Sequence, residues 1–187
     1  MEESCNATDG AMAALIGGDE EKVRALAEAT DVDVANLNAP GQIVISGTSA
    51  GIDDAVGKAK EFGIRRAIKL NVAGAYHSRL MAAAQEKLAV ELAGTTITSP
   101  VIPIVANFTA AAVSSEDEIR SALTSQVTGS VRWIESIQHL VAQGHTSFIE
   151  IGPGKVLAGL VAKIASDATV ISIEDAASLE AAVEALA

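Results

Sequence analysis

The chain has 187 residues, of which 49% are hydrophobic but only 3% are aromatic. A chain of this length can bury a substantial core in one domain or two small ones. Small aliphatic side chains must fill that core, which favours mixed α/β layers. Thirteen basic residues against 24 acidic ones give a formal net charge of -11, which argues against a nucleic-acid partner because phosphates would be repelled.

Cysteine content and hydropathy bear on the compartment. The single cysteine, Cys5, cannot form an intrachain disulfide, and the N-terminal residues do not resemble a signal peptide. No apolar run approaches the roughly 18 to 20 residues that a membrane-spanning helix needs, because Gly, Asp, Lys or Arg interrupts every candidate. We therefore expect a cytoplasmic protein without a membrane partner.

Residues 11–73 are predicted to form a compact βαββαβ unit. Asp19 is placed to cap the first helix, and Pro40-Gly41 supplies the turn of a hairpin. The expected elements are strand 11–16, a helix after Asp19, strands 32–37 and 43–45, helix 51–62 and strand 67–72. This order indicates a split βαβ arrangement of the ferredoxin-like type.

From residue 78 onward, long helices alternate with short, nearly all-apolar strands. The helices are expected at 80–92, 116–125, 133–142, 156–164 and 179–186, and the strands at 101–105, 147–151 and 170–173. Apolar strands separated by helices predict a parallel sheet that is covered on both faces. Three strands are too few for a self-sufficient sheet of this kind, so we expect sheet partners that the chain itself lacks.

Three segments carry the strongest motif signal: Asn38-Ala-Pro-Gly-Gln-Ile-Val-Ile-Ser-Gly47, Ala75-Tyr-His-Ser78 and Glu150-Ile-Gly-Pro-Gly-Lys155. Taken singly, they predict a hairpin, a strand-to-helix junction and a tight turn. Taken together, they resemble the C-terminal part of the malonyl-CoA:acyl carrier protein transacylases, over about residues 10–164. The resemblance implies an α/β fold, with a ferredoxin-like small subdomain at 11–73 and the C-terminal part of an α/β-hydrolase-like parallel-sheet subdomain at 74–187.

His77 is the main candidate for chemistry. It stands between a strand and a helix, where an imidazole can act in acid/base catalysis, although an isolated His-Ser pair at such a junction more often serves in capping or packing. The resemblance implies that His77 takes a proton from a nucleophilic serine as malonyl is transferred. It also implies that the main-chain carbonyl of Gln126 orients the imidazole, although Gly129 and Ser130 replace the family's usual Asn-Pro nearby. As a bare pattern, Gln126 is a polar residue at a helix C-terminus.

Two further residues bear on the substrate. The resemblance implies that Asn38 lines the active-site cleft, whereas its pattern alone indicates only a hairpin residue. Related domains that select malonyl over methylmalonyl have an aromatic residue immediately before the histidine, which implies that Tyr76 crowds an α-methyl group. Such a difference of one methyl is typically worth about 1 to 3 kcal/mol.

Five cations lie within twelve residues: Lys58, Lys60, Arg65, Arg66 and Lys69. Two interpretations remain open for this set, which we call the basic cluster. It is either a solvated surface or a docking patch for an anionic partner, and acyl carrier protein is such a partner in the resembled family.

The family's Gly-Gln-Gly segment, its Gly-His-Ser-x-Gly nucleophile turn and its malonyl-binding arginine normally precede the region that Met1 begins. We therefore expect this chain to supply the base without the nucleophile and to be inactive alone, with malonyl-CoA and acyl carrier protein as the partners that the resemblance implies. The alternatives for the missing region are a separate N-terminal half, a loss in annotation or assembly, and an evolutionary deletion. No cofactor or metal spacing is evident. The rival hypothesis is a non-catalytic ferredoxin-like module that binds a carrier protein or a small ligand.

Overall fold

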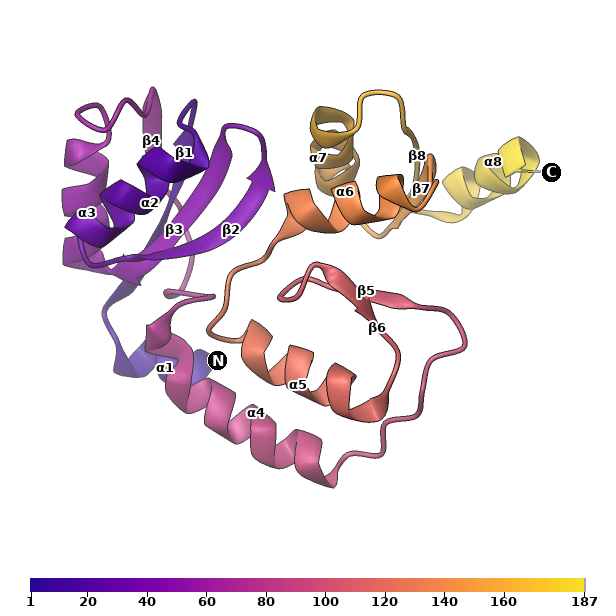
Figure 1. The fold of residues 1–187 in the computed structure, drawn as a ribbon, viewed down its shortest axis with the longest axis horizontal. Helices are drawn as coiled ribbons and strands as arrows, with labels where there is room; N and C mark the ends of the chain where they lie inside the picture. Colours follow the sequence, from indigo (N-terminus) through magenta and orange to yellow (C-terminus); the bar gives the residue numbers. More distant parts are fainter. Residues whose placement is uncertain (187) are drawn as a thin grey trace. The chain divides into compact units, whose positions relative to one another are not determined.

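The computed structural model describes residues 1–186 and divides into two compact units, Met1–Ser136 and Ile137–Ala187. The first unit contains a four-stranded antiparallel sheet, a two-stranded antiparallel sheet and most of the helices (Figure 1). Its elements are α1 (Glu2–Ala7), β1 (Gly10–Ile16), α2 (Glu20–Ala29), β2 (Asp33–Ala39), β3 (Gln42–Thr48), α3 (Ser49–Lys58), β4 (Arg66–Lys69), the 3₁₀ turn η1 (Arg79–Met81), α4 (Ala82–Gly94), β5 (Ile104–Ala106), β6 (Ala111–Val113) and α5 (Glu116–Gln126).

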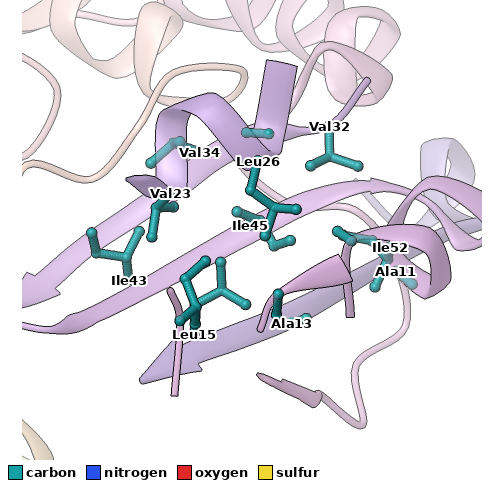
Figure 2. Close-up of a cluster of buried hydrophobic side chains, with 14 of the residues drawn as sticks. Ala11, Ala13, Leu15, Val23, Leu26, Val32, Val34, Ile43, Ile45 and Ile52 are labelled. Carbon is teal, nitrogen blue, oxygen red and sulfur yellow. The ribbon is translucent and has the colours of Figure 1, made fainter. Parts of the chain in front are cut away.

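The four-stranded sheet has the strand order β2-β3-β1-β4, and all of its neighbours are antiparallel. The predicted βαββαβ order of elements is therefore confirmed. Helices α2 and α3 bury their apolar sides on one face of this sheet, where Leu26 and Val23 of α2 pack among strand residues such as Leu15, Ile43 and Ile45 (Figure 2). These side chains are at most 2% exposed, so this layer is the main core of the unit.

Local signals explain where these elements begin. The Asp19 carboxylate accepts a hydrogen bond of 2.9 Å from the main-chain N–H of Lys22, which caps α2 as predicted. Thr48 caps α3 in the same way through Gly51. Between β2 and β3, Gly41 has a φ of +70°, a conformation that suits glycine. Turn and capping chemistry therefore agree with the structure at these ends, whereas α3 (Ser49–Lys58) and β4 (Arg66–Lys69) end earlier than the predicted helix 51–62 and strand 67–72.

The rest of the first unit differs from the sequence prediction in two respects. Helix α1 was not predicted; it packs against η1 and α4. The predicted strand 101–105 begins only at Ile104, and it pairs with β6, which was also not predicted, in an antiparallel hairpin. The segment therefore does not contribute to a parallel sheet. Val101 and Ile102 are fully or largely exposed, so their apolar character was misleading about local structure.

The predicted subdomain boundary between residues 73 and 74 stays a prediction. It falls inside the first compact unit, whose C-terminal limit is Ser136. Within that unit, the segment after residue 74 contacts β2. Val131 donates its main-chain N–H to the Ala35 carbonyl and accepts from Leu37 N–H, so it extends the edge of the sheet by one bridge.

The second unit is built on a single pair of parallel strands. The strands are β7 (Ser147–Ile151) and β8 (Thr169–Ile173), which pair in parallel. Helix α7 (Val156–Ile164) connects them, and α8 (Ala176–Leu186) follows β8. Helix α6 (Trp133–Ala142) carries the chain from the first unit into the second. The predicted third strand is not part of this sheet. Ile149 and Ile151 share one face of β7 and have exposed fractions of 48% and 82%, so no layer covers that face among the described residues.

The described residues contain neither a membrane-spanning helix nor a metal-binding group of side chains. Among residues 1–186, no helix has the length and apolar character needed to cross a membrane. Over the same range, no group of three or more His, Cys, Asp or Glu side chains is arranged to hold a metal ion.

Candidate functional site

His77 lies in a turn between β4 and η1 that is held in an uncommon backbone conformation. Its φ is +57°, a left-handed value that a residue with a side chain adopts only when its surroundings hold it there. The next residue, Ser78, is fully buried, and its hydroxyl donates to the Ala75 carbonyl at 2.6 Å and accepts from Leu80 N–H at 3.3 Å. Ser78 therefore clasps the turn from both sides, while His77 itself is only half-buried.

The structure brings His77 and Gln126 together. The imidazole Nδ1 lies 2.9 Å from the main-chain oxygen of Gln126. Gln126 is the last residue of α5, where carbonyl groups lack intrahelical partners. A carbonyl can only accept a hydrogen bond, so this contact requires a proton on Nδ1, and the neutral imidazole then carries its lone pair on Nε2.

The side chain of Gln126 has a different partner. Its Nε2 lies 3.3 Å from His77 Nδ1 and also 3.3 Å from the Gly129 carbonyl oxygen. Because a protonated Nδ1 and an amide N–H are both donors, only the contact with Gly129 is a hydrogen bond in that tautomer. The carboxamide thus stabilises the turn after α5, and the main-chain oxygen contacts the imidazole.

A capping box fixes the other end of α5. The Ser115 hydroxyl accepts from Glu118 N–H, and the Glu118 carboxylate accepts from the main-chain N–H groups of Ser114 and Ser115. These hydrogen bonds lower the pKa of Glu118 below its ordinary value. The helix that presents Gln126 is therefore held at both ends.

His77 lines a cavity of about 550 Å³ within the first unit. The lining residues combine charged, amide, hydroxyl and aromatic groups: Arg24, Asp33, Val34, His77, Arg79, Ala82, Gln85, Phe108, Thr128, Gly129 and Ser130. The two hydroxyls of this lining are already engaged, because Thr128 donates to Gln85 and Ser130 donates to the Val34 carbonyl. Neither is hydrogen-bonded to His77, and over residues 1–186 no hydrogen bond to its Nε2 is found.

Gly129 lies in close contact with an aromatic ring. A Cβ atom at residue 129 would lie 2.3 Å from the ring of Phe108, which is far inside van der Waals contact. The Phe108 ring therefore packs directly on the main chain of the turn, and only glycine permits this approach.

The structure does not bring Asn38 and Tyr76 into this cavity. Asn38 is half-buried in β2, and Tyr76 packs between two small hydrophobic clusters, one containing Cys5 and Met81 and the other Met12. Contact with the Cys5 side chain raises the pKa of the Tyr76 hydroxyl. Neither side chain is part of the lining around His77, so their roles at the substrate stay predictions.

The basic cluster divides into paired and unpaired cations. Lys58 forms an ion pair of 2.8 Å with Asp54, and Lys69 one of 2.7 Å with Asp53. The remaining three are exposed and have no carboxylate within 4 Å in the part of the chain that the structure describes: Lys60, Arg65 and Arg66. Two of the five charges are thus already paired with carboxylates of α3. Lys58 and Asp54 have the i,i+4 spacing of a helical ion pair, whereas Lys69 and Asp53 are 16 residues apart, so spacing could not indicate that pair.

Sequence reasoning also missed the charged rim of the cavity. Arg79 follows the His-Ser pair directly, and it bonds to the carboxylates of Asp33 and Asp31 at 3.1 and 2.7 Å. These hydrogen bonds, to Asp33 first, raise the pKa of the Arg79 guanidinium. Arg24, also in the lining, pairs with Glu20 of α2. The partners are 46 and 48 residues from Arg79, so no local pattern could reveal them.

The third motif, Glu150 to Lys155, has a structural function in the second unit. The Glu150 carboxylate accepts hydrogen bonds from the main-chain N–H groups of Leu157 and Ala158, at 2.9 and 3.0 Å, and from the Ser172 hydroxyl. Glu150 therefore caps the start of α7 from the preceding strand. The glycines at 152 and 154 both have positive φ, which lets the chain turn back to bring the helix onto that carboxylate.

Comparison with known proteins places these features in a family. The family described as "Acyl transferase domain" matches residues 2–181. The malonyl CoA-acyl carrier protein transacylase of Bacillus subtilis (strain 168) is 44% identical over 194 residues, which cover 100% of this chain and 60% of that protein. The chain thus spans about 60% of the length of the curated relatives that it matches.

Solved structures agree. The crystal structure of the acyl-carrier-protein S-malonyltransferase from Bartonella henselae is 38% identical with a TM-score of 0.92, covering 98% of this chain and 61% of that one. A malonyl-transacylase in complex with its type II PKS acyl-carrier protein is 34% identical with a TM-score of 0.90, covering 98% and 62%. The chain belongs to the acyl transferase domain family and is a homologue of the malonyl-CoA:acyl carrier protein transacylases.

Proposed function

We propose that this chain supplies the general base for transfer of malonyl from CoA to the pantetheine thiol of acyl carrier protein. The observation that carries the proposal is the hydrogen bond between His77 Nδ1 and the main-chain oxygen of Gln126. It fixes the neutral tautomer in which Nε2 is free to accept a proton, and His77 lines a cavity of a size that suits an extended thioester arm.

In the first half-reaction, a serine hydroxyl attacks the thioester carbonyl of malonyl-CoA as Nε2 of His77 removes its proton. The carbon–sulfur bond then breaks, and the protonated imidazole returns the proton to the departing CoA thiolate. The Gln126 carbonyl stabilises the imidazolium through the Nδ1 hydrogen bond. The products are malonyl-serine and CoA.

The second half-reaction runs the same chemistry in reverse order. The pantetheine thiol gives its proton to Nε2 and attacks the malonyl-serine ester; the serine oxygen leaves and recovers the proton from His77. The 187 residues contain no Gly-His-Ser-x-Gly sequence. In this proposal, a segment outside them contributes the serine and the arginine that binds the malonyl carboxylate.

Partner and substrate selection extend the proposal. Acyl carrier protein docks on the unpaired cations of the basic cluster, Lys60, Arg65 and Arg66, because these charges are exposed and none of them forms an ion pair within the described residues. Lys58 and Lys69 contribute less, since each is already paired. The motif resemblance adds two further proposals. Tyr76 crowds the α-methyl group of methylmalonyl and so favours malonyl, and Asn38 contacts the substrate.

The proposal is tested by joining this chain to a nucleophile-bearing segment and replacing the base. The fusion carries the N-terminal region of the Bacillus subtilis relative, which precedes the part matched by this chain. Transfer of labelled malonyl from CoA to carrier protein is then measured. We expect His77→Ala to lower kcat/KM by about 100-fold or more, the usual contribution of a positioned acid/base. Gln126→Ala should have a smaller effect because its main-chain oxygen is retained.

Two controls accompany this experiment. His139→Ala changes a histidine of α6 that is not part of the cavity lining, and it should leave transfer unchanged. The 187-residue chain alone should form no covalent malonyl adduct by intact mass, because a base cannot replace the covalent nucleophile. Near-full activity of His77→Ala in the fusion would remove His77 from the mechanism.

A further inference from the structure

His77 has an unfavourable backbone conformation, and the hydrogen bond from its imidazole to Gln126 does not by itself hold the main chain in that conformation. A non-glycine residue in the left-handed region is energetically unfavourable and persists only where neighbouring contacts hold it. Ser78 clasps the turn locally. A contact from a distant element is needed to fix the turn relative to the βαββαβ sheet.

Asp33, the first residue of β2, makes that contact. Its Oδ2 accepts a hydrogen bond of 2.9 Å from the main-chain N–H of Arg79, and its two oxygens lie 3.1 and 3.2 Å from Nε of the same arginine. A single carboxylate thus binds both the main chain and the guanidinium of the residue two positions after His77. The bond spans 46 residues, so it joins the turn to the edge strand of the sheet.

The main-chain bond should dominate. The Arg79–Asp31 pair is largely exposed, with 55% and 88% of the two side chains accessible, and exposed pairs of this kind contribute little. Asp33 is less exposed, at 28%, and its acceptor satisfies an N–H at the start of η1 that has no helical partner. The same geometry would survive loss of the guanidinium but not loss of the acceptor.

We propose that Asp33 and Arg79 are positioning residues: the Asp33 carboxylate holds the 77–79 turn on β2, and thereby keeps the His77 imidazole on the Gln126 carbonyl. Arg79 assists by orienting that carboxylate. Both residues line the same cavity as His77, at its charged rim. Their effect on transfer rests on the proposed function, whereas their effect on the imidazole can be measured in this chain without any activity.

The test reads the His77 tautomer directly. The chain has three histidines, so their imidazole nitrogens can be assigned by long-range ¹H–¹⁵N spectra. At about pH 9, well above the ordinary imidazole pKa of about 6.5, wild-type His77 should show the Nδ1–H tautomer. Asp33→Ala should shift it toward Nε2–H, the form that free imidazole side chains prefer in water. Exchange of the Arg79 amide with solvent should rise at least tenfold.

Conservative and matched variants separate positioning from general damage. Asp33→Asn keeps an oxygen acceptor for Arg79 N–H and should retain the wild-type tautomer; Arg79→Ala should shift it only slightly. Asp54→Ala, which breaks the exposed Lys58 pair on α3, should change nothing at His77. If Asp33→Ala does not fold, Asp33→Ser gives the same readout, because its hydroxyl is one bond too short to reach the amide.

Two results would overturn the inference. One is a wild-type tautomer and unchanged Arg79 exchange in a folded Asp33→Ala or Asp33→Ser protein. The other is an Asp33→Asn protein that behaves like Asp33→Ala, because the main-chain hydrogen bond would then not be the holding contact. In the fusion that carries a nucleophile, Asp33→Ala should lower kcat about tenfold with KM nearly unchanged. A shifted tautomer with undiminished transfer would contradict the proposed function and leave the positioning inference intact.

Discussion

At the residue scale, the turn that carries His77 begins against a glycine at the start of β1. A Cβ at Gly10 would lie 2.8 Å from both the Cβ and the main-chain nitrogen of Ala75, two residues before His77. Neither atom can move without moving the turn. Glycine suits position 10 because the main chain of Ala75 leaves no room for a side chain, and not because the backbone there needs a positive φ.

We therefore expect Gly10→Ala to lower the free energy of unfolding of the first unit by about 1 to 3 kcal/mol, the usual range for overpacking. Chemical denaturation followed by amide exchange in β1 measures the loss. Gly57→Ala is the matched control, because residue 57 lies within α3 and a Cβ there meets nothing within 4 Å; it should be neutral or slightly stabilising. Equal stability of the two variants would show that Ala75 can move away from the added methyl group without a measurable loss of stability.

Single residues also mark the limit of sequence reasoning. The pairing of His77 with the Gln126 carbonyl was predicted, but only through the family resemblance, since 49 residues separate the two. The Asp33–Arg79 contact and the packing of Phe108 on Gly129 were not predicted. Each depends on two segments meeting in space, and neither residue type is unusual in its own local pattern.

At the element scale, hydrophobic periodicity predicted the bounds of helices and strands best where capping or turn residues also marked their ends. Helix α6 and strand β7 have the predicted bounds, and α2 begins at its predicted cap. The antiparallel pairing of Ile104–Ala106 with β6 was missed because apolar runs of three residues do not distinguish parallel from antiparallel partners. Strand direction is set by tertiary contacts that the pattern does not encode.

Glu150 gives a testable consequence at this scale. Removing its carboxylate by Glu150→Ala leaves the N–H groups of Leu157 and Ala158 without their acceptor. The free energy that stabilises α7 should therefore fall by about 0.5 to 2 kcal/mol, the usual effect of deleting a helix cap. Faster amide exchange at Leu157 and Ala158 would report the loss. Glu180→Ala, an exposed change on α8, is the control. Unchanged exchange in the Glu150 variant would mean that water replaces the cap at no cost.

At the scale of the whole molecule, charge is distributed unevenly. The chain carries a formal net charge of -11, yet Lys60, Arg65 and Arg66 are exposed and form no ion pair in the region that the structure covers. Long-range repulsion of an acidic carrier protein by the net charge is screened over about 8 to 10 Å at physiological salt. A local basic surface can therefore attract the same partner at short range.

Reversing Arg65 and Arg66 to Glu should weaken binding of acyl carrier protein and flatten its dependence on salt, which calorimetry or polarisation at several ionic strengths can measure. The matched comparison neutralises two cations at a time. Arg65→Gln with Arg66→Gln should weaken binding more than Lys58→Gln with Lys69→Gln, because the second pair is already neutralised by Asp54 and Asp53. Carrier binding that is the same in all variants and at all salt concentrations would return the basic cluster to a solvated surface.

The order of strands in the four-stranded sheet has a consequence for biosynthesis. Strand β1 lies between β3 and β4, so the first of these four strands to be synthesised is not fully paired until residues 66–69 have followed it. Chains fold from the N-terminus as they are made, and the His77 turn emerges directly after the strand that completes the sheet. Gly10 and Asp33, on which the turn rests, are already in place. Gln126 arrives 49 residues later, so the His77 turn acquires its backbone support before the hydrogen-bond acceptor of the imidazole has been synthesised.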